Sequence, residues 1–180
     1  MKKNIAIIVT FAFSISVFSQ IAIGKSSVSS KSVSLEFGDA NKGVVLPWVN
    51  SSSSVSGVVD GTMIYDITDH KVKVKYTAGW KDLSVNTTGT TVDPLTGTDG
   101  AASQNTLIEY AGARVGIGTG TPSLVSGVLV LEDSNRAMVL PKTASPHLNI
   151  VNPAPGLMVY DTVKKQLALF NGNVWTFWKP

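Results

Sequence analysis

The same pattern of residues occurs twice in this chain, and this internal repeat limits the fold more than any other feature of the sequence. Residues 39–47 (DANKGVVLP) are matched 94 positions later by residues 133–141 (DSNRAMVLP). Residues 61–66 (GTMIYD) are matched 95 positions later by residues 156–161 (GLMVYD). Such a repeat indicates two copies of one supersecondary unit, and units of this kind bury their apolar faces by packing on each other.

The repeat and the composition divide the 180 residues into five parts. They are a signal peptide (1–19), a first β module (31–84), a Gly- and Thr-rich linker with one short strand at 106–110 (85–112), a stalk-like tract containing VGIGT (113–126) and a second β module (127–178). A module of about 50 residues buries too little of its surface to be stable alone. We therefore expect the modules to pack together or the chain to oligomerise.

Short runs of β-branched and apolar residues between turn signals favour an all-β fold made of short strands and hairpins. Residues 71–76 (KVKVKY) alternate between Lys and an apolar residue, which predicts a strand with one wet face and one inward face. This strand forms a hairpin with residues 62–65. Residues 157–160 and 166–170 form its counterpart in the second module. The other expected strands are 32–37, which also alternates, 44–46, 127–131 and 138–140.

Two prolines and one Ser-Pro pair give further local signals. Pro47 and Pro141 should end the strands before them, because proline cannot donate a hydrogen bond to a neighbouring strand. Ser145 and Pro146 have the residue types of a helix N-cap and a first helical position, which predicts one helical turn at 146–150. The matching residues of the first module, 51–54, carry no such signal.

The N-terminus has the three parts of a secretory signal. Lys2 and Lys3 precede an apolar run at residues 5–18, and small residues lie just before Gln20. The run is shorter than the roughly 20 residues that a membrane-spanning helix needs. We expect residues 1–19 to be removed, no membrane span in the mature chain, and an exported protein at the cell surface or outside the cell, with the periplasm as an alternative.

The composition excludes several classes of site. The chain has no Cys, so disulfides, thiolate zinc sites and cysteine nucleophiles are absent. The net charge of +3 comes without a basic patch, which argues against nucleic-acid binding. His70 and His147 lack carboxylates at zinc-site spacing and are expected in solvated loops, while Gly116 and Gly118 precede no helix that could hold a phosphate. We expect no catalytic residue, no metal site, no cofactor and no enzymatic activity.

Four motifs resemble those of a known group of proteins. Residues 115–119 (VGIGT), followed by Pro122, resemble the VGIGTxxP signature of phage tail-fibre stalks and of secreted surface proteins of flavobacteria. Residues 135–141 (NRAMVLP), 153–161 (PAPGLMVYD) and 170–175 (FNGNVW) look still more like the repeats of the flavobacterial (Bacteroidota-type) surface proteins. The resemblance implies an extracellular, β-rich protein without catalytic activity, and the tail-fibre relatives suggest a trimer.

The repeat also separates scaffold residues from candidate functional ones. Residues present in both modules should serve the shared fold, and they are Met63/Met158, Tyr65/Tyr160 and Trp80/Trp175 in packing and Asp66/Asp161 in turns that open the hairpins. Trp48 and Trp178 have no counterpart and are candidates for contact with a ligand, because exposed aromatics stack on sugars or anchor partners. Thr162 lies in an Asp-Thr-Val sequence that resembles O-glycosylation sites in exported flavobacterial proteins.

Together these features predict an exported, non-catalytic structural or adhesive protein of the cell surface or extracellular space, fibre-like and oligomeric. The alternative is a carbohydrate- or protein-binding module that uses Trp48 or Trp178. Self-association should occur through strand edges. Residues 166–170 are the expected contact edge, because the lysines of residues 71–76 discourage pairing in the first module. A surface glycan or another protein is a further candidate partner.

Overall fold

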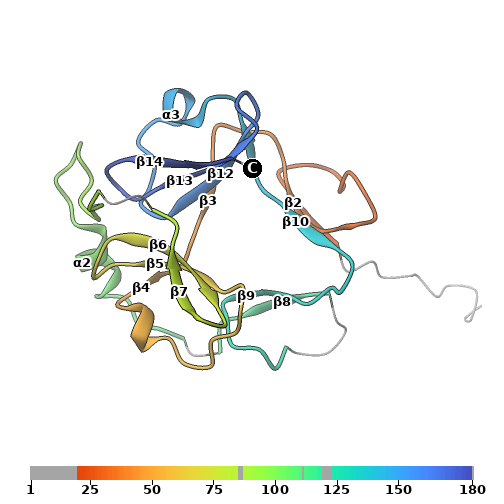
Figure 1. Cartoon of the computed structure of the whole chain (residues 1–180), viewed down its shortest axis with the longest axis horizontal. Helices are drawn as coiled ribbons and strands as arrows, with labels where there is room; N and C mark the ends of the chain where they lie inside the picture. The colour runs from red at the N-terminus through yellow and green to blue at the C-terminus, as the bar shows by residue number, and fades with distance from the viewer. Residues whose placement is uncertain (1–19, 85–86, 111, 119–122, 180) are drawn as a thin grey trace, which may run out of the picture.

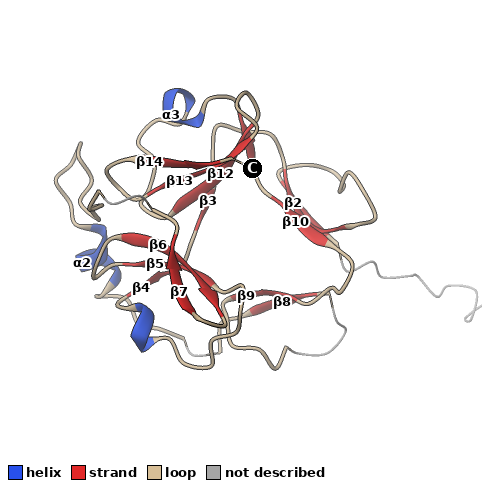
Figure 2. Cartoon of the chain, viewed as in Figure 1, coloured by secondary structure: helices blue, strands red, loops and turns tan. Residues whose placement is uncertain are grey.

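The computed structural model describes residues 20–84, 87–110, 112–118 and 123–179, so the expected signal peptide (1–19) lies outside the described residues. The regular structure is almost entirely β, as Figures 1 and 2 show, and the expected all-β class is confirmed. The strands are β1 (Ile21–Ile23), β2 (Val33–Phe37), β3 (Val44–Val45), β4 (Trp48–Val49), β5 (Met63–Asp66), β6 (Lys71–Tyr76), β7 (Gly79–Asp82), β8 (Val115–Ile117), β9 (Leu129–Leu131), β10 (Ala137–Val139), β11 (Lys142–Thr143), β12 (Leu157–Asp161), β13 (Gln166–Phe170) and β14 (Trp175–Trp178). The helical elements are a 3-10 turn η1 (Ser52–Ser54) and the short helices α2 (Gly100–Gln104) and α3 (Pro146–Asn149).

Two sheets with the same strand order contain the predicted hairpins. One has the order β4-β5-β6-β7 and the other β11-β12-β13-β14, and in each the first pair is parallel and the next two are antiparallel. The hairpins at 62–65/71–76 and 157–160/166–170 are therefore confirmed. His70 and Lys165 occupy equivalent positions in the two hairpin turns, and both have a positive φ, at 57° and 53°.

The residues after each proline form a strand that the sequence analysis missed. Pro47 and Pro141 do end the preceding strands, but β4 and β11 follow at once and pair in parallel with β5 and β12. The proline carbonyls accept hydrogen bonds from the amides of Tyr65 and Tyr160, each at 2.9 Å. Proline lacks a donor but keeps its acceptor, so the chain stays in the sheet while the donor side is interrupted.

The repeat begins earlier in the chain than the sequence analysis placed it. β8 pairs in parallel with β9, with Val115 opposite Leu129, and β1 pairs in the same way with β2, with Ile21 opposite Leu35. Residues 21–24 (IAIG) therefore match residues 115–118 (VGIG) at the same spacing of 94. The first three residues of the VGIGT sequence thus form the first strand of a repeat. We call residues 21–84 the first repeat and residues 115–178 the second repeat.

The two repeats exchange strands, so they share their sheets. β3 of the first repeat pairs antiparallel with β12 of the second, and β10 of the second pairs in parallel with β2 of the first, as Figure 1 shows. The core cluster draws on both repeats and contains Leu46, Tyr65, Val72, Met158 and Leu169. Each repeat thus contributes a strand to a sheet of the other, as expected for units too small to be stable alone.

The contact between the repeats requires a glycine at position 156. Gly156 has a φ of 79°, and a Cβ placed there would lie 2.9 Å from the Cβ of Tyr65. Its carbonyl accepts a hydrogen bond of 3.1 Å from the amide of Leu46 on the other repeat. Only glycine combines the left-handed backbone with this close approach.

The linker packs on the second repeat through backbone contacts. The amide of Thr90 donates to the carbonyl of Asn171, and the hydroxyl of Tyr65 donates to the same carbonyl at 2.8 Å. The strand expected at 106–110 is absent, since these residues are exposed and form no ladder. Helix α2 lies before them, with the side chain of Asp99 accepting from the amide of Ala101 as a helix N-cap.

Other local expectations need correction. The helical turn at 146–150 is confirmed as α3, but Ser145 is left-handed and its side chain makes no cap hydrogen bond. Residues 51–54, expected to carry no helical signal, form η1 with the Ser51 side chain accepting from the amide of Ser53. Strand β2 has no wet face, because Ser34 and Glu36 are as buried as their apolar neighbours.

The shared packing residues are buried to different degrees. Tyr65 and Met158 are buried, while Met63 and Tyr160 are half-buried. Trp80 and Trp175 are half-buried too and do not belong to the core cluster. Trp175 packs instead against Phe170 and Phe177, with ring centroids 5.3 and 6.4 Å apart.

Candidate functional site

The paired aspartates at the hairpins are structural groups. Asp66 accepts from the amides of Ser52 and Thr68 at 2.7 and 3.0 Å, and its carboxylate lies 2.8 Å from the ammonium group of Lys73. Burial alone would raise the pKa of Asp66, but these hydrogen bonds outweigh it and lower the pKa. The predicted turn-opening role is confirmed for this residue.

Asp161 has the same role in the second repeat. It is fully buried and accepts from the amides of Val163, Lys164 and Ser145 at 2.9, 3.3 and 3.2 Å. Burial raises the pKa of Asp161, and the three amides together lower it further than burial raises it. Both carboxylates are ionised and hydrogen-bonded by their own turns, so neither has the open, proton-accepting geometry of a general base.

The histidines do not form a metal site. His70 lies half-buried in the turn before β6, which corrects the expectation of a solvated loop, while His147 is exposed and contacts the edge of Phe177 at 5.6 Å between ring centroids. Among the residues that the structure describes, no group of three or more His, Asp and Glu side chains is placed to hold a metal ion. In the same residues no helix is long and apolar enough to cross a membrane.

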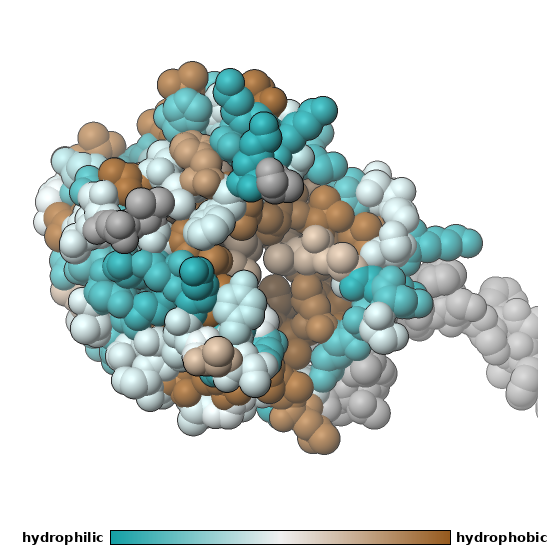
Figure 3. All heavy atoms as spheres, viewed as in Figure 1, coloured by the Kyte–Doolittle hydropathy of each residue, from teal (hydrophilic) through white to brown (hydrophobic). Residues whose placement is uncertain are grey.

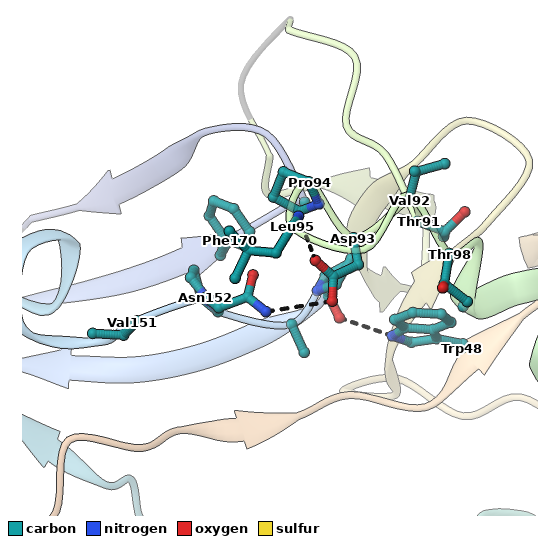
Figure 4. A pocket seen from close by; sticks show the side chains of 15 residues that line it. Trp48, Thr91, Val92, Asp93, Pro94, Leu95, Thr98, Val151, Asn152 and Phe170 are labelled. Carbon is teal, nitrogen blue, oxygen red and sulfur yellow. Dashed lines mark hydrogen bonds between the residues drawn. The ribbon is translucent and has the colours of Figure 1, made fainter.

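Trp48 lines a pocket of about 520 Å³ between the linker and the second repeat (Figure 4). Its indole N–H donates to the carbonyl of Pro155 at 2.8 Å, and its ring lies 5.7 Å from that of Tyr65. Across the pocket, Asn152 donates to Asp93 at 3.4 Å. The remaining wall is mainly apolar, from Val92, Pro94, Leu95, Val151 and Phe170. Trp48 is therefore held in place by the fold and also faces open space.

Trp178 lies apart from this pocket lining. It is 42% exposed, and its indole N–H donates to the carbonyl of Leu83 at 2.8 Å. Leu83 is the position that matches Trp178 in the repeat, so the two repeats also meet at these equivalent ends. The structure does not bring Trp48 and Trp178 together as one aromatic platform.

Thr162 lies at the first position of the turn between β12 and β13, and it is exposed. Its amide donates to the carbonyl of Thr143 at 3.1 Å, which fixes the backbone. A modification of the hydroxyl would meet solvent. The site of O-glycosylation stays a prediction.

The expected contact edge at residues 166–170 is not an edge. Strand β13 lies between β12 and β14, and Ala168 is fully buried. The exposed apolar side chains lie elsewhere. Several parts of the surface carry them (Figure 3), and one group lies on or close to β8 and β9 and includes Val115, Leu124, Val128 and Leu129.

One comparison with known proteins bears on this arrangement. Residues 116–179 match the model of a family described as a phage tail like trimerisation region. The matched range runs from β8 to the end of β14, so it corresponds to the second repeat as the structure defines it. No curated protein and no solved structure gave a significant match. The match supports the expected relation to phage tail-fibre segments.

The strand edges close to β8 and β9 could not be identified from the sequence. The signal was present, because residues 21–24 match residues 115–118 and extend the repeat to its first strand. Only the strand pairing shows which edges of the two repeats are covered and which are open.

Proposed function

We propose that this protein is an exported, non-catalytic structural subunit that self-associates into a fibre-like trimer at the cell surface or outside the cell. The observation that carries this proposal is the match of residues 116–179, nearly all of them in the second repeat, to a phage tail like trimerisation region. Strands β4 to β7 of the first repeat have the same order as β11 to β14 of the second, which supports extending the proposed role in association to both repeats.

The architecture supports a structural role. The strands have between two and six residues, and the two repeats already need each other's strands to complete their sheets. Strands this short form stable structures when several edges are joined, and open edges pair readily with another chain. Short strands and the match of residues 116–179 to a trimerisation region both support the proposed self-association.

The absence of catalysis is part of the proposal and rests on the chemistry of the carboxylates. Asp66 and Asp161 are the buried, repeat-matched acids, and their oxygens are taken up by turn amides and, at Asp66, by Lys73. Their lowered pKa values fit structural anions and do not fit an acid–base pair.

The test is made on intact cells of the native host. A membrane-impermeant cross-linker, followed by immunoblotting, should yield a species of three chains from the cell surface or the medium. Protease added to intact cells should remove the surface-bound protein. A chain that stays inside the cell, or is recovered only as single chains after cross-linking, would contradict the proposal.

Recognition of a carbohydrate is a second candidate function, supported by the position of Trp48. Its ring borders a pocket that also offers the polar groups of Asp93 and Asn152, and sugar sites commonly combine a ring with such groups. A glycan array with the wild type, Trp48→Ala and Trp178→Ala tests it. Binding that is lost only in the Trp48 variant supports recognition, and no binding by the wild type rejects it.

A further inference from the structure

Among the described residues, two of the four sheets lack a strand that the equivalent sheet of the other repeat has. In the first repeat β1 and β2 are joined by β10, whereas in the second repeat β8 and β9 form a sheet of two strands. In the second repeat β12 is paired with β3, whereas in the first repeat β5 has no such partner among the described residues. The repeat therefore predicts two vacant strand positions, one beside β9 and one beside β5.

The strand types that would fill these positions are known from the paired repeat. Strands β2 and β9 are equivalent in the two repeats, and so are β3 and β10. Because β10 pairs with β2, the strand expected beside β9 is a β3 from another copy. Strands β5 and β12 are also equivalent. Because β3 pairs with β12, the strand expected beside β5 is a β10 from another copy. Both vacancies can be filled by one contact, in which the second repeat of one copy meets the first repeat of another.

The backbone at β5 is open in the way this contact requires. Tyr65 directs its amide to Pro47, on the side away from β6, and residues two apart in a strand face the same side. The N–H and C=O groups of Met63 therefore face that side too, where no described strand pairs with them. At the matching residue of the second repeat, Met158 pairs with Val44.

Gly61, the counterpart of the glycine that contacts Tyr65 within the chain, has no residue packed on it among the described residues. Gly61 has a φ of 89°, close to the 79° of its counterpart Gly156. A Cβ on Gly156 would collide with Tyr65, whereas a Cβ on Gly61 would meet nothing within 4 Å. Gly61 thus has the backbone of an interface glycine without the residue that covers it. The residue equivalent to Tyr65 is Tyr160, on the second repeat.

Leu35 and Tyr65, at the contact between the two repeats, are buried, and their counterparts at the two vacant positions are more exposed. Leu35 on β2, which lies opposite Met138 of β10, is 1% exposed, whereas its counterpart Leu129 on β9 is 43% exposed. Tyr65 is fully buried, whereas Tyr160 is half-buried. Val45 on β3 is 47% exposed. The apolar surface left open is therefore the surface that the internal contact covers in the other repeat.

We infer that a second copy of this chain docks head to tail on the first, by repeating the contact that joins the two repeats within one chain. β10 of one copy adds to β5 of the next, with Tyr160 against Gly61, and β3 of the next copy adds beside β9 of the first. This inference rests on the proposed self-association and identifies its surface. The contact joins two different faces, so it closes into a ring or continues as a filament, and the proposed trimer corresponds to closure at three copies.

The internal contact fixes the register of the contact between copies. Leu157 lies opposite Val45 and Met158 opposite Val44. At the equivalent positions Thr62 of one copy lies opposite Val139 of the other, and Met63 lies opposite Met138. Residues directly opposite in an antiparallel pair have Cα atoms about 4.5–5.5 Å apart, within the range that a disulfide spans.

Cysteine pairs test this register, because the natural chain contains no Cys. A Thr62→Cys chain is mixed with a Val139→Cys chain, dissociated, reassembled and oxidised. A disulfide-linked pair containing one chain of each kind is expected, while each chain oxidised alone should give no linked pair. The double variant should form linked oligomers. A chain with both Val45→Cys and Leu157→Cys is the matched control and should form the disulfide within one chain.

Light scattering on the same samples separates the two levels of the account. If the variants are oligomeric and the control oxidises, but Thr62→Cys and Val139→Cys chains do not link, the docking surface is wrong and the proposed self-association stands. If the wild type is a single chain at high micromolar concentration, both fail. A disulfide between separate Val45→Cys and Leu157→Cys chains would show that the repeats pair between chains, and it would overturn the head-to-tail scheme.

Discussion

Gly61 and Gly156 occupy equivalent positions in the two repeats, and replacing each by Ala separates backbone strain from packing at the contact between repeats. Both glycines have a positive φ, so each Ala variant loses about 1–2 kcal/mol from left-handed strain. Each also gains roughly 0.4–1 kcal/mol from a less flexible unfolded chain. These two effects are nearly the same for both variants and cancel in the comparison.

The clash with Tyr65 makes the difference. A Cβ at position 156 would lie 2.9 Å from the Cβ of Tyr65 and 3.2 Å from its Cγ, so the backbones of the two repeats must separate. Overpacking of this kind costs about 1–3 kcal/mol. We expect Gly156→Ala to lower the free energy of unfolding by about 1–3 kcal/mol more than Gly61→Ala does.

Urea unfolding, followed by tryptophan fluorescence, measures this difference at a protein concentration at which both variants are single chains. The concentration matters because association through Gly61 would add stability that depends on it. Equal losses in the two variants would refute the close contact between Gly156 and Tyr65. At high concentration Gly61→Ala should weaken assembly more than Gly156→Ala does, since it obstructs the proposed docking surface while its single-chain fold stays intact.

Three further predictions concern other parts of the chain. The hydrogen bonds from Lys25 and from the amide of Ser29 lower the pKa of Glu36 to about 2, and the pKa values of Asp66 and Asp161 are also lowered. Because the unfolded chain therefore binds more protons than the folded chain below about pH 5, the free energy of unfolding should fall as the pH drops from 5 towards 2. A melting temperature that stays constant over this range would contradict these assignments. Ala168→Lys should lower the free energy of unfolding by roughly 3 kcal/mol or more, because it places an unpaired charge in the middle of a sheet; a fully folded variant with wild-type urea midpoint would contradict the position of β13. Peptide mass spectrometry of protein from the native host should show a sugar on the peptide that contains Thr162, and an unmodified peptide would reject that site.

The parts of the fold that the sequence predicted are those encoded over short distances. The alternation in residues 71–76 and the acidic turn residues Asp66 and Asp161 specify the hairpins locally, and both hairpins are present. The all-β class follows from many such local signals. Pro146 likewise marks the start of a helical turn through its own fixed φ.

The parts that it did not predict depend on partners far away in the chain. Strands of two residues such as β4 and β11 have no periodicity of their own and exist because β5 and β12 pair with them. The place of a strand in its sheet is equally non-local, which is why residues 166–170 were interpreted as an edge although β13 is flanked on both sides. The linker strand at 106–110 shows the converse, since apolar residues without a partner strand stay in an exposed loop.

The candidate site was found in part. Trp48 was identified because it has no counterpart in the repeat, and it lines the pocket, whereas nothing local distinguishes Gly61 from Gly156. The difference between those two glycines arises from what packs on each of them. That information appears only when the two repeats are compared in three dimensions.

Size-exclusion chromatography with light scattering on the chain that starts at Gln20 measures directly whether the protein self-associates. We expect the wild type to have the mass of three chains and the Gly61→Ala variant to shift towards the mass of one chain, while both proteins keep the same circular dichroism spectrum. A wild type that elutes as one folded chain at high micromolar concentration would contradict the claim that this protein acts through self-association.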